Sequence, residues 1–249
     1  MALPPPAEAP EMTGHAVIAC DVFAEELRLL GGEHPPWRVL ELLEMGLHDR
    51  PDELRREIQN TIHRLENDPC VGTVLLLYGL CGNGLVGVRP GRARLVLPRA
   101  HDCISILLGG CEQHSKVLAG EPGTYFYSPG WIREKRVPGP DREAHLRKHY
   151  GERFGDDPEI IEDLLEADRE AFSHHNRAAY VDLFPNDEAE AYSRACAHCM
   201  GWRFERLRGD PALLRGLFAK EWDPARYLLV EPGQAITLAH DGTLVQARP

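Results

Sequence analysis

The chain has 249 residues, of which 43% are apolar and 27% charged, a composition that predicts a folded core and excludes a disordered chain. Acidic residues outnumber basic ones by 39 to 28, and the net charge of −11 argues against nucleic acid or an anionic membrane as the main partner. No apolar run approaches the roughly 18 residues that a membrane span needs. We therefore expect a soluble, cytoplasmic protein.

Strand-like and helix-like stretches alternate in the first half of the chain. Residues 1–13, which include three consecutive prolines and no basic residue, are predicted to be a disordered leader and not a secretory signal. Beyond it we predict strands over 15–20, 37–43, 71–78, 94–97 and 124–128, with a helix as the alternative for 37–43. Helices are predicted over 22–30, 50–67 and 103–118. This alternation favours an α/β fold with a mostly parallel, Rossmann-like sheet, in which ligands bind outside the carboxyl ends of the strands.

The second half of the chain is richer in helical patterns. Helices are predicted over 141–150, 157–180 and 186–203, and strand-like runs over 227–230 and 235–238 close the chain. A cluster of proline and glycine at 129–140 is the best candidate for an internal boundary. We therefore expect one α/β domain over 14–249, with a sub-boundary at 129–140 and a helix-rich C-terminal part.

Seven cysteines in a chain without an export signal argue against a disulfide framework. They leave three roles, namely a small buried residue, a metal ligand or a nucleophile. Three of the seven follow predicted strands: Cys20 ends the first, Cys81 lies in the turn after the third, and Cys103 follows the fourth. Because the carboxyl ends of parallel strands meet at one edge of a sheet, these three sulfurs could converge on one point.

Three thiolates at one point repel each other unless a cation holds them, so the pattern predicts a metal site. Zinc with one open position fits three cysteines, and so does a [4Fe–4S] cluster in which one iron lacks a protein ligand. His101 lies two residues before Cys103 and adds an imidazole, which suits zinc. The alternative is that Cys20 and Cys81 are small buried residues, a common state for cysteine outside disulfides.

Residues near these cysteines are candidates for binding a substrate or cofactor. Glycines in the turn after the third strand let the backbone approach a ligand closely. The aromatic stretch at 125–131 could wall a pocket and stack on a flat ligand, or its rings could fill the core of a sheet. The candidate binding residues are Gly79, Gly82, Asn83, Gly84, Tyr127 and Trp131. Elsewhere, Cys196 and Cys199 form an isolated C-x-x-C pair, whereas a structural zinc normally needs a second pair.

Several segments of the chain carry a family resemblance. They are Ala19-Cys20, the turn Tyr78–Gly84, the stretch Pro98–Cys103 with Leu107–Gly109 after it, Pro122–Tyr125, and Pro129–Trp131. As a set they resemble a bacterial and archaeal family that is designated only as a domain of unknown function, number sixteen thirty-eight, over roughly 15–233. The family has no assigned activity. Its members accompany corrinoid-dependent methyltransferase systems, so the resemblance implies methyl-group chemistry.

The sequence and the resemblance together predict a metal-binding protein with a three-cysteine site, which acts in methyl-group or corrinoid-linked one-carbon metabolism. As an enzyme it would be a zinc-dependent methyltransferase, by analogy with zinc enzymes that alkylate thiols through a His-x-Cys pair and a distant cysteine. Its partner would be a small-molecule substrate or a corrinoid protein. The alternatives are an iron–sulfur protein with an open iron, a non-catalytic protein that binds a metal or cofactor, and metal-free thiol chemistry at Cys81.

Overall fold

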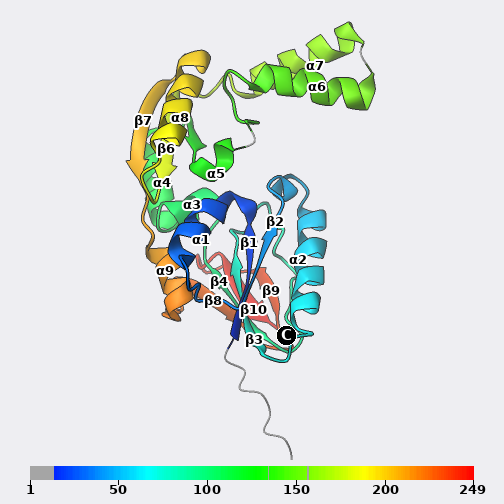
Figure 1. Ribbon diagram of the computed structural model, residues 1–249, viewed down its shortest axis with the longest axis vertical. Helices are drawn as coiled ribbons and strands as arrows, with labels where there is room; N and C mark the ends of the chain where they lie inside the picture. Colours follow the sequence, from blue (N-terminus) through cyan, green and yellow to red (C-terminus); the bar gives the residue numbers. More distant parts are fainter. Residues whose placement is uncertain (1–13, 134, 156) are drawn as a thin grey trace, which may run out of the picture. The chain divides into compact units, whose positions relative to one another are not determined.

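The computed structural model describes residues 14–133, 135–155 and 157–249 (Figure 1). The leader predicted at 1–13 lies outside the described residues. The chain divides into two compact units, the first formed by 14–21, 27–103 and 212–249, and the second by 22–26 and 104–211. The predicted sub-boundary at 129–140 therefore falls within the second unit. No helix in the described part of the chain is long and apolar enough to cross a membrane.

The first unit is built on a five-stranded sheet in the order β2-β1-β3-β4-β8. Its strands are β1 (Gly14–Cys20), β2 (Val39–Leu43), β3 (Val71–Leu77), β4 (Arg94–Pro98) and β8 (Tyr227–Val230). β1 pairs in parallel with β2 and β3, and β3 pairs in parallel with β4, whereas β8 runs antiparallel to β4. This pairing confirms the predicted α/β class and the mostly parallel, Rossmann-like sheet.

Helices pack on both faces of this sheet. The remaining elements here are η1 (Asp21–Phe23), α1 (Ala24–Gly31), η2 (Leu47–Asp49), α2 (Pro51–Leu65), α9 (Ala212–Ala219), β9 (Ala235–Leu238) and β10 (Val245–Arg248). Val22 and Phe23 of η1 and the first residues of α1 belong to the second unit. α2 packs against β1, and α9 packs against β3 and β4 on the other side of the sheet (Figure 1). The buried face of α2 is formed by Leu54, Ile58, Ile62 and Leu65, as their helical spacing predicts.

The second unit has a smaller sheet of its own. Its parallel strands are β5 (Thr124–Tyr127), β6 (Arg177–Asp182) and β7 (Arg203–Arg208), with β6 in the centre. Its helices are α3 (Cys103–Leu107), whose first residue belongs to the first unit, α4 (Cys111–Gly120), α5 (Pro129–Ile132), α6 (Arg142–Phe154), α7 (Pro158–Ala171) and α8 (Asp187–Met200). α8 packs against β6 and β7, and α6 and α7 lie side by side (Figure 1).

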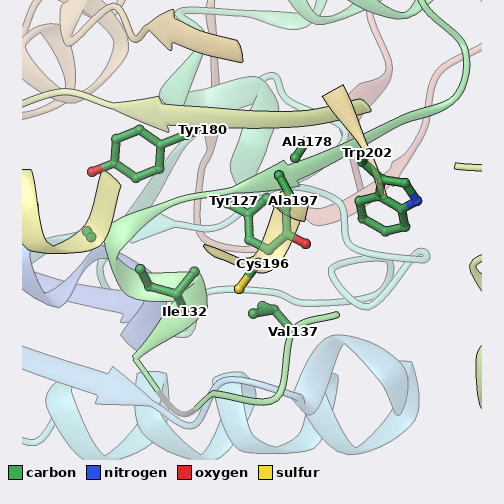
Figure 2. Close-up of a cluster of buried hydrophobic side chains, with 9 residues drawn as sticks. Tyr127, Ile132, Val137, Ala178, Tyr180, Cys196, Ala197 and Trp202 are labelled. Atoms are coloured by element: carbon green, nitrogen blue, oxygen red, sulfur yellow. The ribbon is translucent and has the colours of Figure 1, made fainter. Parts of the chain in front are cut away.

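Aromatic and small side chains form the core of the second unit (Figure 2). Tyr127 is fully buried there, and its hydroxyl donates a hydrogen bond to the carbonyl of Pro138 at 2.7 Å. The sulfur of Cys196 is also buried and lies against Gly139, where an added Cβ would come within 2.4 Å of it. Both side chains therefore act as packing residues of this core.

Two helices predicted for the second half end earlier than expected, and a strand follows each of them. The helix predicted over 157–180 is wrong beyond Ala171, because residues 177–182 form the fully buried central strand β6. The helix predicted over 186–203 ends at Met200, and β7 follows. The alanines of β6 favour a helix locally, but pairing with two neighbouring strands and burial override that preference.

Other differences are smaller. The helix predicted over 103–118 is interrupted, since Gly109 and Gly110 have φ values of 87° and 147° between α3 and α4. α9 and β10 have no counterpart among the predicted elements, because eight-residue and four-residue segments carry little periodic signal.

A buried carboxyl group lies in the second unit. The Glu26 side chain is 2% exposed, and one of its carboxyl oxygens has no hydrogen-bond partner among the described residues. The pKa of Glu26 is raised to about 7, and burial is the largest cause; the charges of Glu25 and Asp182 act in the same direction, whereas a backbone hydrogen bond and the charge of Arg133 oppose it. The folded protein therefore keeps a proton on Glu26 at pH values where the unfolded chain releases it.

We expect the Glu26→Gln variant to gain stability over the wild type as the pH rises from 4.5 to about 7. Because the folded-state pKa lies above the ordinary value, the wild type keeps the full contribution of this proton below pH 4.5 and loses it as the pH rises through 7. The gain corresponds to on the order of 3 kcal/mol in the free energy of unfolding. Urea unfolding at a series of pH values measures it. Glu170→Gln, at an exposed position, should show the same pH dependence of the free energy of unfolding as the wild type. If the free energy of unfolding of Glu26→Gln differs from that of the wild type by the same amount at every pH, the expectation is contradicted.

Candidate functional site

The strands that precede the three predicted cysteines are neighbours in the first sheet. β1 lies between β2 and β3, and β4 lies on the far side of β3. The chain passes from β1 to β2 on one side and then returns to β3 on the other, so the strand order reverses between β1 and β3. Ligands of open α/β sheets bind at such a switch point, outside the carboxyl ends of the strands. Cys20 is the last residue of β1, and Tyr78 directly follows β3.

The thiols of Cys20, Cys81 and Cys103 meet at this edge of the sheet, and we call them the thiol cluster. The Cys103 thiol makes hydrogen-bond contacts with the thiols of both Cys20 and Cys81. The three residues are 4%, 9% and 4% exposed in chain order. The contacts with Cys20 and Cys81, together with burial, raise the pKa of Cys103 well above its ordinary value. The structure therefore brings together three sulfurs that are remote along the chain and shields them from water.

Backbone hydrogen bonds bring Cys81 beside Cys103. The amide of Leu80 donates to the carbonyl of Ala100 at 2.9 Å, and the amide of Cys81 donates to the carbonyl of His101 at 3.0 Å. The two loops thus continue, beyond the strand ends, the parallel pairing of β3 with β4. This pairing sets the distance between the two loops and therefore between their thiols.

Cys81 begins a tight turn in the left-handed region. Cys81, Gly82 and Asn83 have φ values of 45°, 62° and 69°, and the amide of Gly84 donates to the carbonyl of Cys81 at 3.1 Å. Positive φ at both central residues is the geometry of a type I′ turn, which favours glycine and asparagine. A side chain other than glycine or asparagine is strained in this region, and such strain is concentrated at functional sites. The strained residue here is the one that carries a thiol of the cluster.

Tyr78 adds a hydroxyl to the thiol cluster, and the sequence analysis did not predict it. The side chain is 1% exposed, and the hydroxyl lies against the Cys20 thiol with Cys103 and Cys81 nearby. The hydroxyl forms no hydrogen bond to a nitrogen or oxygen atom among the described residues. Burial and these sulfurs raise the pKa of Tyr78 far above its ordinary value. The sequence feature that could have indicated this role is the position of Tyr78, a polar hydroxyl at the end of an apolar strand and next to the turn that carries Cys81.

The other predicted site residues are placed differently. The side chain of His101 is exposed, and its backbone carbonyl is what contacts the turn of Cys81. In that turn, Gly79 and Gly84 are buried, whereas Gly82 and Asn83 are exposed.

The aromatic candidates belong to the second unit. Tyr127 fills the core of that unit, in agreement with the alternative role considered for these rings. Trp131 is half-buried, and its backbone amide donates to the hydroxyl of Ser128 at 3.3 Å. Cys199 is exposed beside the buried Cys196.

The thiol cluster consists of thiol–thiol contacts around Cys103. None of the seven cysteines forms a disulfide. Among the residues that the structure describes, no three His, Cys, Asp or Glu side chains stand in a geometry that could hold a metal ion. The donor set itself, three buried sulfur atoms, is the one that thiophilic metals prefer. The arrangement offers paired thiols for oxidation or three sulfurs for a soft cation.

A family model described as Protein of unknown function (DUF1638) matches residues 42–218, which is more than half of the chain. The matched region includes Tyr78, Cys81 and Cys103 and begins after Cys20. Comparisons with curated proteins and with solved structures each found no match. The chain therefore belongs to the DUF1638 family of proteins of unknown function.

Proposed function

We propose that the thiol cluster of Cys20, Cys81 and Cys103 binds a thiophilic metal ion, with zinc as the first candidate. The observation that supports this proposal is the contact of the Cys103 thiol with both other thiols at the switch point of the sheet. Buried thiolates this close together repel one another, and a divalent cation offsets that repulsion. The raised pKa of Cys103 is what we expect of the metal-free state, in which the thiols keep their protons.

The proposed chemistry is methyl transfer. Cys20, Cys81 and Cys103 would hold the zinc ion as thiolates, and the ion would supply Lewis-acid chemistry that keeps a substrate thiol deprotonated and nucleophilic at neutral pH. In the transfer, a sulfur–carbon bond forms, the bond between methyl group and donor breaks, and its electron pair leaves with the donor. This chain contributes the three sulfurs and a site from which water is excluded. A corrinoid protein as methyl donor is the part of the proposal that rests on the family resemblance.

A second candidate is a [4Fe–4S] cluster. In the described part of the chain three cysteines meet at this edge, which is the number of protein ligands in a cluster with one open iron. His101, the remaining candidate ligand, has an exposed side chain. In this alternative the open iron binds the substrate.

Metal analysis of protein purified without oxygen tests the proposal. We expect one zinc ion per chain, held tightly enough to compete with a chromophoric chelator, in a colourless protein. A brown protein with visible absorbance that disappears in air would favour the iron–sulfur cluster. Absence of any bound metal, with rapid alkylation of Cys81, would overturn the proposal and leave metal-free thiol chemistry.

Turnover is tested separately. The zinc-loaded protein is mixed with methylcobalamin and a simple alkyl thiol, and the loss of the methyl–cobalt bond is followed by absorbance. Transfer to the thiol by the unaided protein supports an enzyme. Tight zinc binding without any transfer would favour the non-catalytic role, in which the protein carries a metal or cofactor for another protein.

A further inference from the structure

We propose that Tyr78 is a positioning residue of the thiol cluster, whose hydroxyl donates a hydrogen bond to the sulfur of Cys20 when that sulfur is a metal-bound thiolate. This inference rests on the proposed function. Tyr78 would not itself bind the metal and would act through Cys20.

The first observation is a contrast among the buried tyrosines. Tyr127, Tyr180 and Tyr227 are fully buried, and each donates its hydroxyl proton to a backbone carbonyl, at 2.7, 3.3 and 2.7 Å respectively. Tyr78 is equally buried, but its hydroxyl has no oxygen or nitrogen acceptor among the described residues. Ala19 of β1 lies opposite Leu77 of β3, so the next residues, Cys20 and Tyr78, are neighbours across the two strands, and the Cys20 thiol is the group that lies against the hydroxyl. A buried hydroxyl without an acceptor destabilises the fold, so the structure leaves this donor available at the site.

The second step concerns what the neighbouring sulfur can accept. A protonated thiol is a weak acceptor, so the metal-free cluster satisfies Tyr78 poorly. A thiolate is charged, and hydrogen bonds to charged acceptors are about twice as strong as neutral ones. Metal binding converts the thiol of Cys20 to a thiolate, and the hydroxyl of Tyr78 then gains its partner. Tyr78 therefore stabilises the metal-bound state more than the metal-free state.

The Tyr78→Phe variant separates this role from a merely structural one. Because the variant removes a hydroxyl that lacks a good acceptor, the metal-free protein should unfold at an unchanged or higher temperature. Zinc affinity should nevertheless fall by about 10-fold to 100-fold, the range seen when a hydrogen-bond partner of a metal ligand is removed. In the cobalt(II)-substituted protein, the sulfur-to-cobalt charge-transfer band should move to lower energy, since the sulfur has lost a hydrogen bond.

Tyr227→Phe is the matched control in the same sheet. Its hydroxyl bonds to the carbonyl of Leu213, so its loss should lower the unfolding temperature but leave the cobalt spectrum and zinc affinity unchanged. If Tyr78→Phe keeps both the affinity and the spectrum of the wild type, the inference is overturned while the metal site stands. If Tyr227→Phe shifts the spectrum equally, the effect is not specific to Tyr78 and the assignment is also overturned. A wild type that binds neither zinc nor cobalt overturns the inference together with the proposed function.

Discussion

In the Cys103→Ser variant, zinc affinity should fall at least about 100-fold. Structural zinc sites bind with roughly 10–16 kcal/mol over four ligands, so the loss of one thiolate ligand removes about 3 kcal/mol. We choose Cys103 for replacement among the three cysteines because its thiol contacts both of the others. Competition with a chromophoric chelator, under anaerobic conditions, measures the change.

The control for this experiment is Cys199→Ser. Cys199 is exposed in the second unit, so its replacement removes one cysteine without touching the thiol cluster. This variant should bind zinc as tightly as the wild type. If Cys199→Ser loses the ion and Cys103→Ser keeps it, the metal is held by the C-x-x-C pair and the proposed site is wrong.

The Gly79→Ala variant should lose both stability and zinc affinity. A Cβ added at Gly79 would lie 2.4 Å from the Cα of Asp102 and 2.6 Å from the backbone nitrogen and carbonyl carbon of the same residue. Backbone atoms cannot move aside as a side chain can, so the loops that carry Cys81 and Cys103 must separate. We expect the free energy of unfolding to fall by about 3 kcal/mol or more, as for strong overpacking in a core.

Gly120→Ala provides the comparison for this glycine. An added Cβ at Gly120 meets no atom within 4 Å, and the residue ends α4, so the change should be neutral or slightly stabilising. Urea unfolding and zinc titration of both variants give the result. A Gly79→Ala protein as stable as the wild type would show that the two loops do not approach as closely as described.

Much of the first sheet and the position of the thiol cluster could be predicted from local patterns. The strands that become β1, β3 and β4 are short apolar runs, which is typical of strands buried on both faces of a parallel sheet. Each run ends at a proline, a glycine or a charged residue, so its carboxyl end is marked in the sequence. Cys20, Cys81 and Cys103 follow these ends, and parallel pairing then places them at one edge. Placing the three cysteines at one edge needs only the type and direction of each element, which local patterns carry.

Features that depend on contacts between distant segments could not be predicted in this way. Residues 177–180 are predicted as the end of a long helix, partly because of their two alanines, and pairing with β5 and β7 makes 177–182 a strand. The sequence leaves Tyr127 either as a pocket residue or as a core residue, and it is the tertiary structure that places its hydroxyl on the carbonyl of Pro138 inside a core.

The details of the site also depend on contacts between distant segments and could not be predicted from local patterns. Side-chain packing across neighbouring strands sets three details: the Cys103 thiol is central, the side chain of His101 is exposed, and the hydroxyl of Tyr78 approaches Cys20. Strand periodicity specifies the direction in which a chain runs. It carries no information about which side chains meet once the strands are paired, because those contacts join residues that are far apart in the sequence.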